Sequence, residues 1–374
     1  MPIYKLNGIF LLMGFNCGIV GLPNVGKSTL FNALTLTNAE VATYPFTTID
    51  PNMGIVEVPD ERLYKIGEII KPKKLTSTSI EFVDIAGLVK GASKGEGLGN
   101  EFLAHMRNVD AICHVVRCFE DKNIAHVEEN INPIRDIETV NLELIIADLN
   151  TVGKRIDKLN RLSKTGDKKA RETVNLLEKI KEILEKGEWL GPYLKEIPEV
   201  LKEIQLLTAK PFIYVANVDE ESMLEDSDYT KQVKEVGKKD GVPVVKICAK
   251  VEAELSELTI SDRKEFIKEL GLKESGLDKF IREGYRLLDL ITFFTTVGPE
   301  VRAWTVKRGT RAQKAAGKIH SDMEKGFIKA EVISYEDLIQ TGSVQLCKEK
   351  GIMRIEGRDY IVQDGDILHF RFNV

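Results

Sequence analysis

Short apolar runs of strand length recur along the first 250 residues of the chain. They are residues 15–20, 80–83, 111–116, 211–216 and 244–247. Short runs in which apolar residues dominate are typical of strands inside a sheet. A helix-like run, Thr29–Leu34, follows the loop after the first strand. The pattern predicts an α/β fold with helices on both faces of the sheet.

A different pattern, with helical spacing, separates the third of these strands from the fourth. Apolar residues spaced alternately by three and four form a coiled-coil seam, namely Leu142, Ile145, Leu149, Val152, Ile156 and Leu159. Ser163–Asp167 has the composition of a turn, and the apolar positions of a return helix follow at Val174, Leu177, Ile180 and Leu184. These residues predict an inserted antiparallel helical hairpin, a coiled-coil arm.

The tip of this predicted arm is strongly basic. Residues 154–171 contain eight Lys or Arg and two Asp, a local charge of +6, whereas the whole chain has a net charge of −5. A basic tip on an acidic protein indicates a contact with nucleic acid or the ribosome. The alternative is an ordinary solvated helical face, and without further information the two interpretations are equally supported.

From Ile291 onward the chain changes to short β-rich runs. The predicted strands are 292–297, 301–306, 328–333, 360–362 and 367–372, with a short helix at Ala312–Ile319. Asp364–Asp366, with its central glycine, has the composition of a hairpin turn. This part has a net charge of +2 and no catalytic constellation. We therefore expect it to be a binding module.

Length and composition limit the class of protein. At 374 residues, with 43% hydrophobic and 30% charged residues, the chain is expected to form two or three globular domains. The five cysteines are scattered and none forms C-x-x-C, so a reducing cytoplasm is expected. The apolar run near the start is too short to span a membrane, and residues 1–12 are expected to be a non-native extension before Met13.

Residues 21–29 carry the most specific chemical signal. Gly21–Thr29 matches G-x-x-x-x-G-K-[ST] between a predicted strand and a predicted helix, the setting of a phosphate-binding loop. Its amides and the helix N-terminus favour bound phosphate, Lys27 can reach the β- and γ-phosphates, and Ser28 can bind Mg²⁺. The candidate nucleotide-binding residues here are Asn24, Val25, Gly26, Lys27, Ser28 and Thr29.

Two further segments fit the metal and the γ-phosphate. A threonine within Val41–Asn52 could complete the Mg²⁺ shell. Asp84 ends a predicted strand and can hold Mg²⁺, while the amide of Gly87 can bond the γ-phosphate. Leu88 follows where Ras-like enzymes have a glutamine that orients water. Leucine cannot do so, so another group must orient the water, or hydrolysis is slow until a partner completes the site.

Two polar residues have open roles. His126 precedes a charged, loop-like stretch and is the candidate mobile catalytic group, although a surface histidine is the simpler interpretation; His114, within a strand, is expected in the core. Asn24 could help to seat K⁺, or it could bond its own backbone.

The strand at 211–216 leads into the expected base-reading residues. Asn217, Val218 and Glu220 occupy the positions at which GTPases usually have Asn-Lys-x-Asp. A valine replaces the lysine and Glu220 replaces the aspartate that reads guanine. Losing a bidentate base contact removes roughly 1–3 kcal/mol of discrimination. Guanine selectivity should therefore be poor, and ATP becomes a credible substrate. Cys248 stands where serine is usual.

Together these motifs resemble the Obg-like ATPases, the YchF family, in the translation-factor class of P-loop GTPases. The resemblance rests on 21–29, 44–48, 84–91 and 217–220, and on 301–305 and 315–320. It implies a nucleotidase that takes ATP at least as well as GTP, Mg²⁺ at Ser28 and Thr48, adenine contact through Val218, and a requirement for K⁺. It also implies a C-terminal TGS domain of β-grasp fold, ribosome association and a role in translation or stress response.

These expectations define a domain plan and three functional hypotheses. The nucleotide-binding domain covers 13–130 and 206–290, the coiled-coil arm 131–205, and the TGS domain 291–374. The first hypothesis is a cytoplasmic, Mg²⁺-dependent nucleotidase that acts as a ribosome-associated switch through the arm tip and the TGS domain, with no membrane or DNA partner. The alternatives are a guanine-specific Obg-type GTPase and a nucleotide-binding adaptor with negligible hydrolysis.

Overall fold

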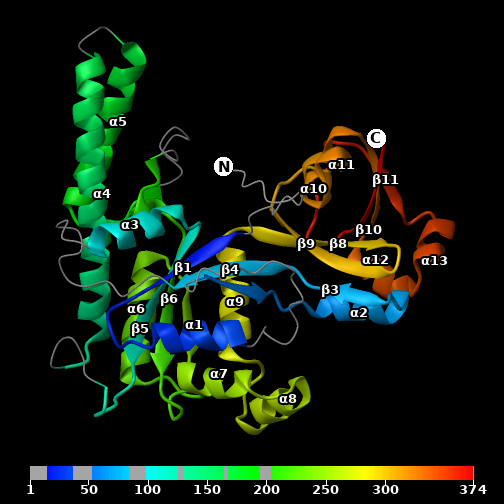
Figure 1. Ribbon diagram of the computed structural model, residues 1–374, viewed down its shortest axis with the longest axis horizontal. Helices are drawn as coiled ribbons and strands as arrows, with labels where there is room; N and C mark the ends of the chain where they lie inside the picture. Colours follow the sequence, from blue (N-terminus) through cyan, green and yellow to red (C-terminus); the bar gives the residue numbers. More distant parts are fainter. Residues whose placement is uncertain are drawn as a thin grey trace. The chain divides into compact units, whose positions relative to one another are not determined.

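The computed structural model describes residues 15–36, 53–84, 98–124, 130–163, 167–193 and 204–373 (Figure 1). These residues fall into two compact units. The large unit contains the described residues within 16–54 and 82–280. The small unit contains Phe15 and residues 55–81 and 281–373. No helix in the described ranges combines the length and apolarity that crossing a membrane requires.

A six-stranded sheet of order β2-β4-β1-β5-β6-β7 organises the large unit. Its strands are β1 (Asn16–Val20), β2 (Met53–Glu57), β4 (Ser79–Asp84), β5 (Ala111–Cys118), β6 (Phe212–Val218) and β7 (Val244–Ile247). The pairs β1–β5, β5–β6 and β6–β7 are parallel. The division between the two units falls within β2 and β4. Each strand predicted from an apolar run in this region is confirmed.

Helices cover both faces of this sheet (Figure 1). The helices of the large unit are α1 (Lys27–Leu36), α3 (Leu98–Asn108), α4 (Pro133–Ser163), α5 (Lys168–Glu185), α6 (Asp228–Asp240), α7 (Ala249–Ser256) and α8 (Ile260–Glu269), with short 3₁₀ turns at Gly191–Tyr193 and Leu207–Ala209. The division between the units falls within α9 (Gly276–Leu287). Helices α1 and α7 pack together, whereas α4 packs with α6, and both contact β5. The predicted α/β architecture is therefore confirmed.

The predicted arm is the hairpin of α4 and α5 (Figure 1). Its apolar core combines the expected residues of both helices, Ile145, Val152, Ile156, Val174, Leu177, Ile180 and Leu184. Asp167 caps α5 by accepting a hydrogen bond from the Ala170 amide at 3.0 Å. Leu142 departs from the predicted seam, since it is 54% exposed. Helix α5 has 18 residues against 31 in α4, so it cannot cover the whole seam.

The small unit contains a second six-stranded sheet, of order β11-β10-β12-β8-β9-β3. The strands are β3 (Lys74–Thr76), β8 (Leu290–Val297), β9 (Glu300–Lys307), β10 (Phe327–Ile333), β11 (Arg354–Glu356) and β12 (Ile367–Phe372). Strands β8 and β9 form an antiparallel hairpin, β12 runs parallel to β8, and β10 is antiparallel to β11 and β12. This order from β9 to β11 is that of a β-grasp fold.

Five helices flank this sheet within the described residues, and one of them was predicted with its bounds. The helices are α2 (Glu61–Ile70), α10 (Ala312–Ile319), α11 (Ser321–Lys325), α12 (Tyr335–Thr341) and α13 (Val344–Glu349). Helix α10 has the predicted bounds. The strand predicted at 360–362 is wrong, because only an isolated bridge between Arg311 and Ile361 forms there. The Tyr360 hydroxyl donates to Asp366 at 2.8 Å, which holds this segment in a turn.

Residues 55–81 belong to the small unit, although the sequence grouped them with the nucleotide-binding domain. Strand β3 pairs in parallel with β9 at the edge of the sheet. Leu63 and Ile66 of α2 are buried in one apolar cluster with Phe294 and Val301. The division by contacts therefore differs from the sequence-derived limits at this segment, because its apolar side chains pack on a sheet formed more than 200 residues later.

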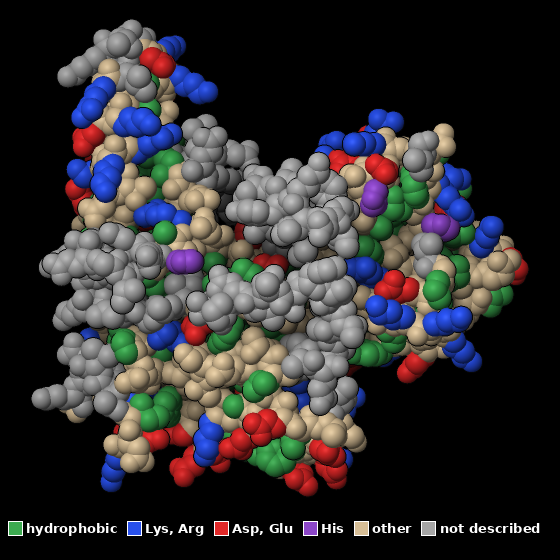
Figure 2. All heavy atoms as spheres, viewed as in Figure 1, with side chains coloured by type: hydrophobic (Ala, Val, Ile, Leu, Met, Phe, Trp, Pro, Cys, Tyr) green, Lys and Arg blue, Asp and Glu red, His purple; other side chains and the backbone are tan. Residues whose placement is uncertain are grey.

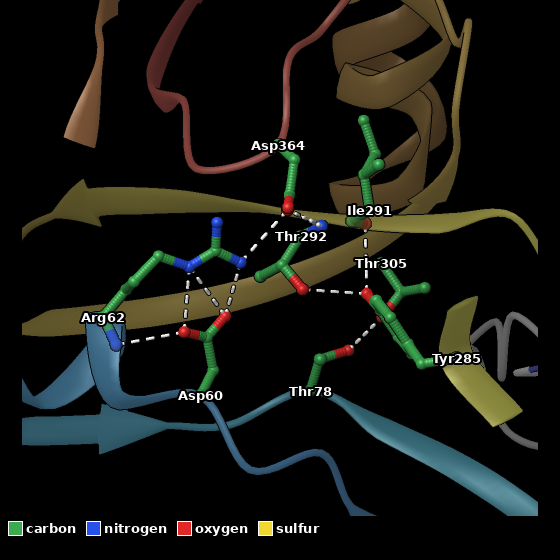
Figure 3. Close-up of polar contacts among 8 residues, drawn as sticks. All are labelled: Asp60, Arg62, Thr78, Tyr285, Ile291, Thr292, Thr305 and Asp364. Carbon is green, nitrogen blue, oxygen red and sulfur yellow. Dashed lines mark hydrogen bonds and ion pairs between the residues drawn. The ribbon is translucent and has the colours of Figure 1, made fainter. Parts of the chain in front are cut away.

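Polar contacts also bind this segment within the small unit (Figure 3). Arg62 pairs with Asp60, the N-cap of α2, and its Nη2 lies 3.0 Å from Oδ1 of Asp364. The same Asp364 oxygen accepts the Thr292 amide at 3.0 Å. The Tyr285 hydroxyl donates to the Ile291 carbonyl at 3.0 Å. Three sequence-distant segments are thus joined by charged and neutral hydrogen bonds around β8.

Candidate nucleotide-binding site

The loop between β1 and α1 has a backbone that only particular residues allow. Gly21 and Gly26 have φ values of 153° and 96°, and Asn24 has φ of 62°. A Cβ at Gly21 would lie 2.4 Å from the Val115 carbonyl oxygen, and one at Gly26 would lie 2.2 Å from Nδ2 of Asn217. The positive φ at Asn24 suits a residue type that tolerates this region. The motif glycines are therefore required by both conformation and space.

Lys27 and Ser28 begin α1 and lie near Asp84 at the end of β4. Lys27 is 7% exposed, and its Nζ donates to the Leu22 carbonyl at 2.7 Å. Burial lowers the pKa of Lys27 to about 8, against the opposing effect of Asp84. An anion beside this ammonium group would restore its preference for the charged form. The lysine is therefore placed to bind a negatively charged group.

Ser28 and Asp84 form an oxygen-rich pair. The Ser28 hydroxyl donates to Oδ2 of Asp84 at 3.4 Å, and Oδ1 of Asp84 is buried without a partner among the described residues. Burial raises the pKa of Asp84, which Lys27 and Ser28 partly offset. A buried carboxylate oxygen without a hydrogen bond is costly unless a cation or a donor approaches it. Hydroxyl and carboxylate oxygens are ligands that Mg²⁺ prefers, so these residues fit that metal.

Asn217, at the end of β6, joins two loops of the site. Its Nδ2 donates to the Val25 carbonyl at 2.9 Å, and its Oδ1 accepts the Ala249 amide at 3.0 Å. The side chain is buried, with 5% of the residue exposed. Both ends of the amide are thus used by backbone groups. Asn217 holds the phosphate-binding loop against the loop that follows β7.

A cavity of about 780 Å³ extends from this loop along the ends of β5, β6 and β7. It is lined by Asn24, Gly26, Lys27, Ser28, Thr29, Phe119, Glu120, Asp121, Ile124, Asn217, Val218, Asp219, Glu220, Cys248, Ala249, Lys250, Ala253 and Glu254. The carboxyl ends of parallel strands are where α/β sheets bind ligands. Most described residues that the sequence selected therefore lie around one cavity of ligand size.

The residues expected to read the base lie at the cavity wall and its rim. Val218 is buried and lines the cavity. The Glu220 carboxylate lies 2.7 Å from Nζ of Lys250, and both side chains are more than half exposed. Cys248 is also buried, and burial raises the pKa of its thiol. Glu220 therefore forms a solvent-exposed ion pair with Lys250, a contact that the motif alone did not indicate.

Residues 119–124 form one wall of the cavity, which no sequence motif indicated. Phe119 and Ile124 supply apolar surface, and Glu120 and Asp121 lie beside them. Its place in the sequence could have indicated this wall. The segment follows the predicted strand at 111–116, at the same edge of the sheet as the phosphate-binding loop. His114, in that strand, is 1% exposed and packs against Phe212 and Tyr214, so its predicted core position is confirmed.

Four residues singled out from the sequence lie outside the described residues. They are Thr48, Gly87, Leu88 and His126. Their expected roles stay predictions.

The fold and this site define a P-loop nucleoside triphosphatase. A family model described as a 50S ribosome-binding GTPase matches residues 16–152, and the YchF-GTPase_C model, described as a protein of unknown function, matches residues 290–373. The chain is 53% identical to the ribosome-binding ATPase YchF of Bacillus subtilis, over 97% of this chain and 100% of that protein. Identity and coverage are the same for the Haemophilus influenzae protein of that name.

A solved structure agrees with these matches. The Schizosaccharomyces pombe YchF GTPase superposes with a TM-score of 0.86 at 38% identity, covering 96% of this chain and 98% of that one. The chain belongs to the YchF family. The family resemblance seen in its motifs is confirmed, as is its class as a nucleoside triphosphatase.

Proposed function

We propose that this protein hydrolyses ATP with Mg²⁺, GTP less well, and acts as a ribosome-associated regulatory switch in translation or stress response. The observation that carries the substrate preference is the base end of the cavity. Glu220, at the guanine-reading position, is ion-paired with Lys250, while Phe119, Ile124 and Val218 offer apolar surface. Apolar walls suit the faces of a purine and do not demand the donors of guanine. The curated relatives carry the name ribosome-binding ATPase, which supports the same substrate.

The phosphate end supports hydrolysis. Lys27 and the loop amides would stabilise charge on the transferring phosphate. Ser28, Asp84 and Thr48 would hold Mg²⁺, which when bound neutralises charge on the β- and γ-phosphates. Gly87 would sense the γ-phosphate through its amide, and His126 is the candidate for the mobile group near the attacking water. Asn24, with its left-handed backbone, is the residue beside which K⁺ would sit.

The arm tip supports the ribosomal role. Lys154, Arg155, Lys158, Arg161, Lys168, Lys169 and Arg171 are all exposed. Figure 2 shows Lys and Arg side chains distributed over the arm. Phosphate backbones bind such surfaces through salt-sensitive contacts. We propose that the arm tip and the C-terminal β-grasp part contact ribosomal RNA or protein in the cytoplasm. The alternative is that the basic side chains of the tip form an ordinary solvated helical face.

A direct test compares nucleotide affinities of the full-length protein. Competition of ATP with GTP, measured with Mg²⁺ present, should show ATP binding at least as well as GTP. Micromolar GTP affinity with no measurable ATP binding would refute the proposal. In the double variant Val218→Lys, Glu220→Asp, the motif of guanine-specific enzymes is restored, so preference should shift toward GTP; an unchanged preference would favour the guanine-specific alternative.

The identity of Leu88 also favours one further candidate, a nucleotide-binding adaptor with negligible turnover. Leucine cannot hydrogen-bond the attacking water. Turnover measured with and without K⁺ and ribosomes separates the two, since a switch enzyme should accelerate when the missing groups are supplied. Turnover that stays negligible under every condition would support the adaptor.

A further inference from the structure

A buried arginine stands behind one wall of the cavity. Arg117, near the end of β5, is 2% exposed. Its guanidinium donates from Nε to the Phe119 carbonyl at 3.1 Å, from Nη1 to the Ile124 carbonyl at 3.1 Å, and from Nη2 to the Asp121 carbonyl at 3.2 Å. All three acceptors belong to the wall 119–124. One side chain therefore fixes both ends and the middle of this loop.

This arrangement needs the geometry of arginine. A guanidinium presents five N–H donors in a rigid plane, whereas a lysine ammonium is a compact point charge with three donors. The Arg117 guanidinium also lies 4.7 Å from the centre of the Phe119 ring, within the range of a cation–π contact. Arg117 thus constrains the ring of Phe119 as well as the backbone of the loop.

Arg117 lies beside Asn217, the residue that bonds the other two loops of the cavity. It is in register with Asn217 across the β5–β6 pair. Residues directly opposite each other on neighbouring strands place their side chains on the same face of the sheet. Asn217 binds the phosphate-binding loop and the loop after β7, and Arg117 binds the remaining wall. Two adjacent side chains therefore anchor three backbone segments around the cavity.

The wall has a weaker outer anchor. The Tyr229 hydroxyl of α6 donates to Oε1 of Glu120 at 2.9 Å in an exposed setting. Hydrogen bonds that compete with solvent contribute little, whereas those from a buried charged group contribute more. The shape of the wall should accordingly depend on Arg117 and only slightly on Tyr229.

We propose that Arg117 is a positioning residue that sets the affinity for the nucleoside part of the bound nucleotide. It acts through the apolar faces of Phe119 and Ile124, which cannot serve phosphate groups. Arg117 itself is not among the residues that line the cavity. The proposal rests on the proposed function in one respect, that this cavity binds a nucleoside triphosphate.

The test separates the nucleoside end from the phosphate end of the cavity. Dissociation constants for ATP and for inorganic tripolyphosphate, both with Mg²⁺, are measured on the full-length protein. In Arg117→Lys, ATP should bind about tenfold or more weakly, whereas tripolyphosphate affinity should stay within about twofold. Tyr229→Phe should change neither by more than about twofold. Equal losses for both ligands, or an unchanged ATP affinity, would overturn the proposal.

A matched control exists in Arg107. It also uses its guanidinium to bond backbone carbonyls, those of Gln205 and Ala147, at the base of the arm. Arg107 also donates to the Thr151 hydroxyl at 2.7 Å and lies 3.7 Å from the buried carboxylate of Asp148, so Arg107→Met destabilises the large unit away from the cavity wall. The ratio of the two affinities should therefore equal that of the wild type. A shifted ratio in this control would mean that general destabilisation explains the Arg117 result.

Phe119→Ala tests the proposal even if Arg117→Lys does not fold. If the wall contacts the nucleoside, this variant must reproduce the selective loss of ATP affinity; if it binds ATP normally, Arg117 cannot act as proposed. Should the wild type bind GTP and not ATP, the ATP preference fails, and the same ratio measured with GTP still decides the role of Arg117.

Discussion

Asn217→Ala offers the sharpest test of how the site is held together. The substitution removes the amide that accepts the Ala249 N–H and donates to the Val25 carbonyl. The residues that carry these two backbone groups are 1% and 2% exposed. Among the residues that the structure describes, neither group has a second hydrogen-bond partner that could replace the asparagine. The prediction is that the phosphate-binding loop and the loop after β7 separate, and the large unit loses stability.

The magnitude follows from the two backbone groups. Leaving a buried donor or acceptor without a partner costs about 1–3 kcal/mol. Asn217 and Ala249 line the cavity, so water that enters the space left by the asparagine side chain can bond the freed groups, and the loss should fall at the lower end. We expect the large unit to lose about 2–3 kcal/mol of unfolding free energy. Native-state hydrogen exchange of peptides from β6 measures this loss within one unit of a two-unit chain.

A double-mutant cycle with Gly26 checks the geometry. A Cβ at Gly26 would lie 2.2 Å from Nδ2 of Asn217, and its φ of 96° strains any other residue. Gly26→Ala should therefore cost less in the Asn217→Ala background, because the clash disappears and only the backbone strain stays. We expect a coupling energy above about 1 kcal/mol. Effects that add within about 0.5 kcal/mol would refute the reasoning.

Three further predictions, two of them paired with a control substitution, test other parts of the fold. Burial raises the pKa of Glu252 to about 7. Because the folded state then holds a proton that the unfolded state has released, the free energy of unfolding falls as pH rises from about 4.5 to 7. Glu252→Gln should remove up to about 3 kcal/mol of that fall, measured by urea titrations at pH 5 and 8. Leu177 is 0% exposed in the arm, so Leu177→Ala should lower the free energy of unfolding by roughly 3 kcal/mol. Leu142 is 54% exposed, so Leu142→Ala should lower it by under about 0.5 kcal/mol. Equal losses in thermal unfolding would contradict the packing. Arg62→Met should destabilise the small unit by roughly 1–2 kcal/mol. The ion pair of Arg308 with Asp289 is exposed on both sides, so Arg308→Met should destabilise the same unit by under about 0.5 kcal/mol. Hydrogen exchange in β8 measures both losses.

Local patterns predicted the inner strands of the large sheet, the arm, α10 and the glycine-rich loop after β1. The strand before the loop, the glycines and Lys27 form one contiguous stretch whose backbone conformation depends on the residues themselves. The same holds for α10 and for the arm, since helical periodicity reports which face is apolar. Periodicity does not report how far a partner helix extends, so it predicts Leu142 in the seam although α5 ends short of that residue.

Features that depend on distant partners could not be read in this way. Residues 55–81 carry apolar side chains that suit either unit, and only the sheet completed by β9 decides between them. The motif shows that Glu220 replaces aspartate, but its ion pair depends on Lys250, thirty residues further along the chain. Charge pairing across such separations follows from the fold and has no local sequence signal.

The wall at 119–124 shows where the two kinds of information meet. Its residues match no motif, and a loop after a strand is an unspecific pattern. Its importance follows from the parallel sheet, because the ends of β5 and β6 lie side by side and bring Arg117 next to Asn217. Under the proposed function, a motif locates the phosphates, whereas strand order locates the nucleoside. If Phe119→Ala and Arg117→Lys lose ATP selectively while tripolyphosphate binding persists, that division of roles is established from two independent residues.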